Sequence, residues 1–359
     1  MQVAGAWSWR ILVVAGVAAL FIFLVMQLKY IVIPLMVAIL LAALLVPLVQ
    51  FLQRHRWPKW LAVAVAEVGT IAIVTGLVWL VVIQIVRQFP ALQDRTMHAY
   101  DDLTAWLLAS PLHLTEPQIR DFVANSLEQL QRDSEFLISG ALSVGSSAGH
   151  FLAGLLLTLF ATLFILIDGR GIWKWVVCLF PRKARIAVNG AGESGWITLT
   201  TFVKVQIFVA AVDAIGIGLG AWILGLVFDG FPLIIPIAVA VFLGSFIPIV
   251  GALVTGAIAV FIALIYLGFW PAVIMLGIVL LVQQFEGHVL QPLVMGTAVK
   301  VHPLAVVFAV AAGSFIGGIP GALFAVPIIA VLNVMVKYVA SGEWRREPHP
   351  DEKDVLANG

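Results

Sequence analysis

Acidic side chains inside the apolar stretches of this 359-residue chain are the first candidates for chemistry. An ionisable residue at mid-membrane costs about 2.5–3.5 kcal/mol on insertion scales, so it is a functional candidate by default. Asp213 lies deep in one apolar stretch, nine residues after Lys204, and is a candidate coupling carboxylate, although a structural role fits it equally. Glu67 and Lys204 lie nearer the ends of their stretches, where an interfacial position explains them as well. Small neighbours of Asp213 permit close helix packing: Ala210, Ala211, Ala214, Gly216, Gly218 and Gly220.

A second group of polar residues follows a later apolar stretch and reads Gln283-Gln284-Phe285-Glu286-Gly287-His288. At 100° per residue, Gln284 and His288 share one face of a helix with Gln291, and the polar arc is too wide for contact with lipid. Glu286 and His288 could carry protons, and the glutamines could hydrogen-bond a polar solute. An ordinary cytoplasmic helix end is the alternative interpretation. The pair Glu286 and His288 has no evident third ligand, so we expect no metal site.

The composition indicates a membrane protein. Hydrophobic residues make up 62% of the chain and charged residues 11%, against about 25% charged residues in ordinary soluble domains. These values exclude a soluble enzyme, a disordered chain and a nucleic-acid binder with a basic stripe. The lone Cys178 excludes a disulfide framework, and the sequence lacks the HExxH, GxxxxGK[ST] and GxSxG motifs. We therefore expect neither an enzyme nor a cofactor.

Apolar runs long enough to cross a bilayer predict about six spanning helices. The predicted spans cover residues 11–28, 31–52, 61–86, 150–167, a stretch opening at Phe202, and 271–290. The first run is longer than the apolar region of a cleaved signal, so we expect it to be retained. A mixed polar stretch, 169–201, precedes the fifth span.

Loop charges predict the orientation of these spans. Lys and Arg are retained on the cytoplasmic side of short loops, and they gather after the second and fourth spans and near the C-terminus. The segment 88–147 instead carries eight acidic residues against three arginines, so we expect it outside, folded as two amphipathic helices over 89–108 and 115–137. We therefore expect both termini to be cytoplasmic.

An internal repeat in the C-terminal half is the most informative pattern. Residues 244–253 and 313–323 both read GSFI, then a Gly/Pro break, then GAL. Proline and clustered glycine interrupt a helix, and each repeat unit divides into halves too short for a full span. We therefore predict two re-entrant helical hairpins, inverted relative to each other by the single span between them. Two kinked pairs of ordinary spanning helices are the alternative. The breaks provide candidate solute-path residues: Pro248, Gly251, Gly317, Gly318, Pro320 and Gly321.

The predicted fold is an all-α polytopic membrane protein with two inverted-repeat hairpins and a small extracytoplasmic helical insertion. The expected parts are helices 1–3 (1–87), the external segment (88–147), the fourth helix with a basic interfacial segment (148–200), a transport core (201–341) and a disordered cytoplasmic tail (342–359).

Three motifs resemble the AI-2E family of bacterial transporters. They are residues 286–296 with Val301-His302-Pro303-Leu304, residues 246–251 with the family's IPxxG break, and residues 317–327. The resemblance spans about residues 10 to 340 and implies a secondary carrier, similar to exporters of autoinducer-2 or to proposed sodium/proton antiporters. It also implies a homo-oligomer, a pentamer, with an elevator-like moving domain. Ile249 stands where the family commonly has an aromatic residue, which leaves the substrate open.

The expected function is export of a small polar solute across the lipid bilayer. The hairpin breaks would expose backbone groups to the solute, Gln283, Gln284, Glu286 and His288 would line the path, and Asp213 would couple transport to H+ or Na+. One alternative is a cation/proton antiporter that uses Asp213 and Glu286. Another is a non-transporting scaffold whose external helices bind a partner.

Overall fold

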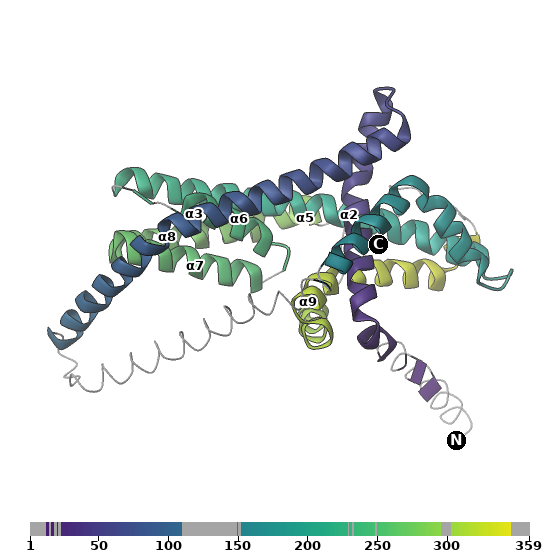
Figure 1. Ribbon diagram of the computed structural model, residues 1–359. Helices are drawn as coiled ribbons and strands as arrows, with labels where there is room; N and C mark the ends of the chain where they lie inside the picture. Colours follow the sequence, from purple (N-terminus) through teal and green to yellow (C-terminus); the bar gives the residue numbers. More distant parts are fainter. Residues whose placement is uncertain are drawn as a thin grey trace, which may run out of the picture. The chain divides into compact units, whose positions relative to one another are not determined.

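The described residues of the computed structural model are helical or lie in short turns, and no strand occurs among them (Figure 1). These residues are 12, 13, 16, 17, 20, 23–109, 149, 152–228, 230, 231, 233–247, 250–295 and 303–345. Within them, six helices are long and apolar enough to cross a membrane. The prediction of an all-helical, multi-pass membrane protein is confirmed. Part of the predicted first span, all of the external helix 115–137 and most of the predicted tail lie outside the described residues.

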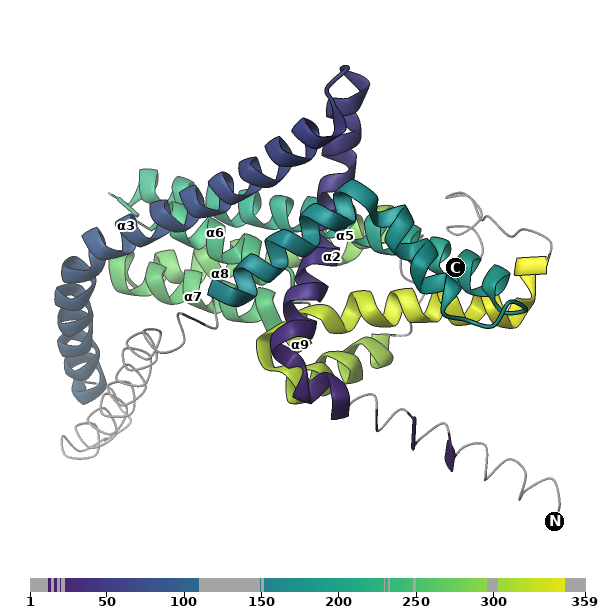
Figure 2. The same ribbon diagram turned by 45° about the vertical axis from the view of Figure 1, so that its right-hand side comes forward.

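Helices α2 (Lys29–Arg54) and α3 (Lys59–Ala109) follow the predicted second and third spans. The predicted external helix 89–108 is helical, but it is not separate, because α3 runs through it without a break over 51 residues. At 1.5 Å per residue α3 is about 77 Å long, more than twice the thickness of a hydrocarbon core. The change from apolar to polar composition therefore does not end this helix, although its axis bends towards its C-terminal part (Figure 2).

The stretch predicted as mixed and polar, 169–201, is helical except for a short turn. The helix Leu152–Cys178 extends into it, and α5 (Arg185–Val227) begins 17 residues before Phe202. The Arg185 side chain donates to the carbonyl oxygen of Cys178, at 2.8 Å, and to that of Phe180, at 3.0 Å. These hydrogen bonds satisfy carbonyls at and just beyond the C-terminal end of the helix Leu152–Cys178. The buried hydroxyls of Ser194 and Thr198 donate to carbonyls four residues earlier in α5. Polar residues thus do not interrupt this helix, and Lys204 lies within it rather than at its start.

The chain divides into two compact units. The first unit comprises residues 1–69, 152–205 and 294–359, and the second comprises 70–151 and 206–293. The first unit's core joins α2, the start of α3 and the helix Leu152–Cys178, where Ala42, Ala62 and Val63 are fully buried. Residues this small let the helix backbones approach closely.

The second unit's core joins the later part of α5 to three shorter helices. These are α6 (Ile234–Gly244), α7 (Val250–Leu267) and α8 (Phe269–Phe285), which lie side by side in both ribbon views (Figure 2). The chain continues from α8 into a π-helix, Glu286–Met295. Helix α9 (Pro303–Ser341), in the first unit, contains one non-helical residue, Gly318. The two repeat units therefore fold as α6 with α7 and as the two halves of α9.

Candidate functional site

A pair of glycines closes the first repeat unit. Helix α6 ends at Gly244, α7 begins at Val250, and the backbones of Gly244 and Gly251 touch. A Cβ atom on Gly251 would overlap the carbonyl of Gly244, and one on Gly244 would lie 2.5 Å from a methyl carbon of Thr255. Only glycine fits at position 251, and a larger residue at 244 would have to displace the Thr255 side chain. This close approach closes a helical hairpin, called hairpin 1 below (residues 234–267).

A second pair of glycines closes the other repeat unit in the same way. A Cβ atom on Gly313 would overlap the carbonyl of Gly321, and a Cβ atom on Gly321 would overlap the carbonyl of Gly313. In a straight helix these residues would be about 12 Å apart, so α9 is bent back on itself. The bend occurs at Gly318, where φ is 62° and ψ is −143°. We call α9 hairpin 2 (residues 303–341); the two glycine pairs explain why both repeats keep the pattern G-S-F-I…G-A-L.

The serines of the two repeats make the same hydrogen bond within their own helices but differ in how far they are buried. The hydroxyl of Ser245 lies 2.8 Å from the carbonyl oxygen of Val241, and that of Ser314 lies 2.7 Å from the carbonyl oxygen of Val310, four residues earlier in each case. Ser314 is exposed, whereas Ser245 is buried against α5. The tip of hairpin 1 is therefore the one that packs against a polar helix face.

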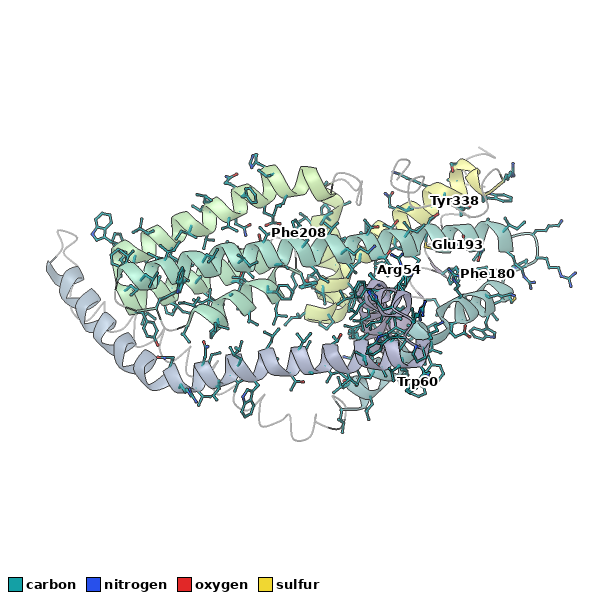
Figure 3. All side chains as sticks on the ribbon, turned by 90° about the horizontal axis from the view of Figure 1, so that it is seen from above. Arg54, Trp60, Phe180, Glu193, Phe208 and Tyr338 are labelled. Atoms are coloured by element: carbon teal, nitrogen blue, oxygen red, sulfur yellow. The ribbon has the colours of Figure 1, made fainter. Side chains whose placement is uncertain are left out.

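Asp213 and Gln206 of α5 both contact Ser245. The carboxylate oxygen Oδ2 of Asp213 lies 3.0 Å from the Ser245 hydroxyl, and the amide Nε2 of Gln206 donates to the Ser245 carbonyl at 2.6 Å. Seven residues separate Asp213 from Gln206, so both occupy one face of the helix, about 10.5 Å apart along its axis. Phe208, labelled on α5 in Figure 3, marks this stretch of the helix, since it follows Gln206 by two residues in the sequence. Ser245 is thus held between two buried side chains.

The small residues after Asp213 pack as expected. A Cβ on Gly216 would lie 2.9 Å from Val282, and one on Gly220 would lie 2.5 Å from Ile278, so α5 packs closely on α8 there. Gly218 faces Ala238 of α6 in the same manner. This packing fixes α5, and with it Asp213, against the neighbouring helices of the second unit.

The polar group at the end of α8 continues from that helix into a π-helix. Residues Glu286–Met295 form a π-helix, which turns more slowly than an α-helix. The ring nitrogen Nδ1 of His288 lies 3.2 Å from the Gln284 carbonyl oxygen. Gln284 and His288 are exposed, while Gln283 and Glu286 are half-buried. Gln284 and His288, which were predicted to share one face, are thus in contact and both exposed, whereas Gln283 and Glu286 are more covered.

Glu67 is buried, with 8% of its surface exposed, although an interfacial position was the simpler interpretation of its sequence context. It lies on α3 in the first unit, beside the core residue Ala66, and its oxygen Oε1 has no hydrogen-bond partner. Close helix packing covers it. Glu67 belongs to the first unit and Asp213 to the second.

Of the predicted site residues, Asp213 contacts hairpin 1 through Ser245, while Gly251 lies against Gly244 in the same hairpin. Gly317, Gly318, Pro320 and Gly321 form the bend of hairpin 2, while Pro248 lies outside the described residues. Within the described part of the chain, no group of three His, Cys, Asp or Glu side chains could hold a metal ion. Sequence reasoning missed Gln206 and Ser245. The spacing of Gln206 from Asp213 inside an apolar run was the available signal.

Comparisons with known proteins agree with the helical architecture. The sequence model described as AI-2E family transporter matches residues 11–341. MT0215 of Mycobacterium tuberculosis, provisionally named a transport protein, is 37% identical over 353 residues, covering 98% of this chain and 94% of that protein. YrrI of Bacillus subtilis, also provisionally named a transport protein, is 25% identical over 86% of each chain. TqsA of Escherichia coli, named an AI-2 transport protein, is 24% identical over 87% of each chain.

Proposed function

This chain belongs to the AI-2E family of transporters, and from that premise we propose that it is a secondary carrier that exports a small polar solute. As a multi-pass membrane transporter it contacts the lipid bilayer and the solute it carries. The proposal adds a bacterial plasma membrane, cytoplasmic termini and a homo-oligomer in which the hairpins move in an elevator-like manner. Autoinducer-2 is the first solute to test, because the relative TqsA is named for its transport.

The paired glycine-closed hairpins are the observation that carries this proposal. Each break leaves backbone groups without helical partners, and in a membrane such groups persist only beside protein or a water-filled cavity. Paired broken helices in corresponding halves of a chain are the best sequence indication of a transporter's binding site. Hairpins closed at Gly251 and Gly321 are therefore placed by this proposal on the solute path.

The polar end of α8 supports a polar rather than an apolar solute. Gln283, Gln284, Glu286 and His288 offer amide, carboxylate and imidazole groups within six residues, and two of them are exposed. A π-helix such as Glu286–Met295 is rare and is frequent at functional sites. In the proposal these side chains hydrogen-bond the solute on its way past the hairpins.

Uptake of autoinducer-2 into inside-out membrane vesicles tests the proposal. Leucine at Gly251 or at Gly321 cannot fit against the facing carbonyl, so each substitution would displace the two halves of its hairpin. Because misplaced groups lower a rate steeply, we expect the initial rate of uptake to fall by roughly tenfold or more. Gly277→Leu is the matched control, because nothing lies within 4 Å of a Cβ there. Rates that stay at the wild-type level in both hairpin variants, at equal protein amounts, would show that the hairpins do not form the path.

A second candidate function is cation/proton antiport. The buried Asp213, with one carboxylate oxygen lacking a partner, favours it. Proton movement driven by sodium in the same vesicles, abolished by Asp213→Asn and by Glu286→Gln, would support antiport. Solute uptake that continues without any such proton movement would exclude it.

A further inference from the structure

The turn that joins the helix Leu152–Cys178 to α5 carries positive charge without any acid to balance it. Residues 169–192 contain five Lys and Arg residues and no Asp or Glu. All five belong to the first unit: Arg170, Lys174, Arg182, Lys183 and Arg185. Within the part of the chain that the structure describes, no ion pair joins any of them to an acid. This segment, called the basic turn below (residues 170–186), therefore attracts anions.

One of the five cations holds the basic turn in shape, and the other four are available to a partner. The guanidinium of Arg185 donates to two carbonyl oxygens, those of Cys178 and Phe180, which have no helical donor. The remaining four are exposed and have no hydrogen bond to another described residue: Arg170, Lys174, Arg182 and Lys183. Four unpaired charges are thus presented on a turn that a fifth one keeps closed.

Large apolar side chains beside these cations are equally uncovered. Trp175 is 65% exposed and Leu179 67% exposed, and Ile186 and Phe180, which Figure 3 labels, are exposed as well. Aromatic residues of this kind collect at the level of the lipid headgroups, with their rings in the apolar boundary. Lys174 precedes Trp175 directly, so an unpaired charge and an uncovered ring lie side by side on the helix.

Packing on α5 fixes which side of the helix Leu152–Cys178 is turned outward. A Cβ atom on Gly192 of α5 would overlap the ring of Trp173, so this ring lies directly against the α5 backbone. Two residues correspond to about 200° of rotation, which turns Trp175 away from α5. The helix therefore cannot rotate to cover the apolar part of the basic turn without losing the contact of Trp173.

The length of this helix places the basic turn at the depth of the headgroups. The helix Leu152–Cys178 has 27 residues and is apolar enough to cross a membrane. It is about 40 Å long, so it crosses a hydrocarbon core of about 30 Å and ends in the headgroup region. Its unpaired cations and its uncovered apolar side chains thus reach phosphates and acyl chains at the same time.

We propose that the basic turn binds the headgroup of an anionic phospholipid. The lipid phosphate complements the four unpaired cations, and the adjoining acyl chains cover Trp175 and Leu179. A zwitterionic phospholipid carries no net charge to balance these cations, and a soluble anion leaves the apolar side chains uncovered. An anionic phospholipid is the partner that satisfies both parts of this surface.

This inference is independent of the solute that the protein carries. None of the residues of the basic turn belongs to hairpin 1, hairpin 2 or the polar end of α8. Binding of an anionic phospholipid would join α5 and the preceding helix to the bilayer surface and stabilise the folded protein.

Thermal unfolding of the purified full-length protein in mixed micelles tests the site. Phosphatidylglycerol and phosphatidylcholine are added to the detergent at equal mole fractions, and inorganic phosphate is added alone in a third series. The wild type should gain a saturable increase in Tm with phosphatidylglycerol and a clearly smaller one in the other two series. Added NaCl should weaken the response to phosphatidylglycerol, because salt screens exposed charges.

The double variant Arg182→Gln with Lys183→Gln removes two of the unpaired cations. Each cation near an anionic bilayer surface contributes about a fivefold gain in affinity, so the apparent affinity for phosphatidylglycerol should fall by roughly tenfold or more. The Tm without lipid should stay the same, because neither side chain bonds to another described residue. Leu179→Ser should also weaken binding, but it should leave the dependence on NaCl unchanged, since it removes no charge.

Lys29→Gln with Arg87→Gln is the matched control. It removes the same amount of charge from exposed positions on α2 and α3, outside the basic turn, and should keep the full response to phosphatidylglycerol. Association of spin-labelled phosphatidylglycerol with each protein in phosphatidylcholine vesicles provides a second measurement should a variant's Tm be too low to compare.

Equal responses to phosphatidylglycerol and phosphatidylcholine would overturn the proposal, as would an unchanged affinity in the double variant of the basic turn. A response to inorganic phosphate as large as that to phosphatidylglycerol would also overturn it, since the site would then bind a soluble anion. The proposed function would survive each of these results, because uptake of solute into vesicles tests it separately.

Discussion

The neighbouring residues Gly317 and Gly318 play different parts in the bend of hairpin 2. At Gly318 the backbone has φ of 62° and ψ of −143°, a combination that is open to glycine and strained for other residues. Gly317 has no positive φ, and nothing lies within 4 Å of a Cβ built on it. Two adjacent glycines in the sequence thus differ in whether the fold requires them.

We predict that Gly318→Ala lowers the stability of the protein by about 1–3 kcal/mol, the typical cost of a strained backbone conformation. Gly317→Ala should leave the stability unchanged or raise it slightly, because alanine favours a helix. Thermal unfolding of both variants in the same detergent measures the difference. Equal Tm values would mean that Gly318 does not hold the bend.

At the scale of helices, glycines set the distance between α5 and α8. Gly216 and Gly220 are one turn apart on α5, and they lie against Val282 and Ile278 of α8. Transmembrane helices gain no hydrophobic effect from each other, since lipid is equally apolar, so their association depends on such close packing. The contact between α5 and α8 should therefore be sensitive to a single methyl group.

We expect Gly220→Ala to destabilise the protein by about 1–3 kcal/mol through overpacking against Ile278. Combining it with Ile278→Ala should remove the clash, so the double variant should be more stable than the sum of the single effects by about 0.5–3 kcal/mol. Gly277→Ala, in the open space next to Ile278, is the control. Additive effects of the two changes on unfolding would contradict direct contact.

At the scale of the whole molecule, the lone cysteine offers a test of orientation. Cys178 is exposed and ends the helix Leu152–Cys178, next to a basic loop that the charge pattern predicts to be cytoplasmic. The acidic segment 88–147 is predicted on the opposite side. One native thiol and one introduced thiol can therefore report both sides of the membrane.

A membrane-impermeant maleimide should leave Cys178 unlabelled in intact spheroplasts and label it in inside-out vesicles. The reverse pattern is expected for a Cys178→Ser protein that also carries Ser134→Cys in the acidic segment. Labelling is read from the mass of the purified protein. Reaction of Cys178 from outside would reverse the predicted topology, and with it the predicted direction of export.

Composition and periodicity were sufficient for the class of this protein. A shortage of charge cannot be reconciled with a water-exposed surface, so the membrane assignment needed no contacts between distant residues. The repeated G-S-F-I…G-A-L pattern likewise predicted two hairpins, because proline and glycine act on the backbone locally. The polar stretch before Phe202 was not predicted to be a helix and proved helical, because its hydroxyls bond within the helix.

Only the tertiary structure decided which polar residues meet. Asp213 stood out in the sequence as a charge in an apolar run, but Gln206 and Ser245 did not, since a glutamine or serine there satisfies no local rule. Ser245 reaches α5 across 32 residues of chain from Asp213 and 39 from Gln206. That contact depends on how closely hairpin 1 packs on α5, and close packing is a property of facing surfaces that no single stretch of sequence contains.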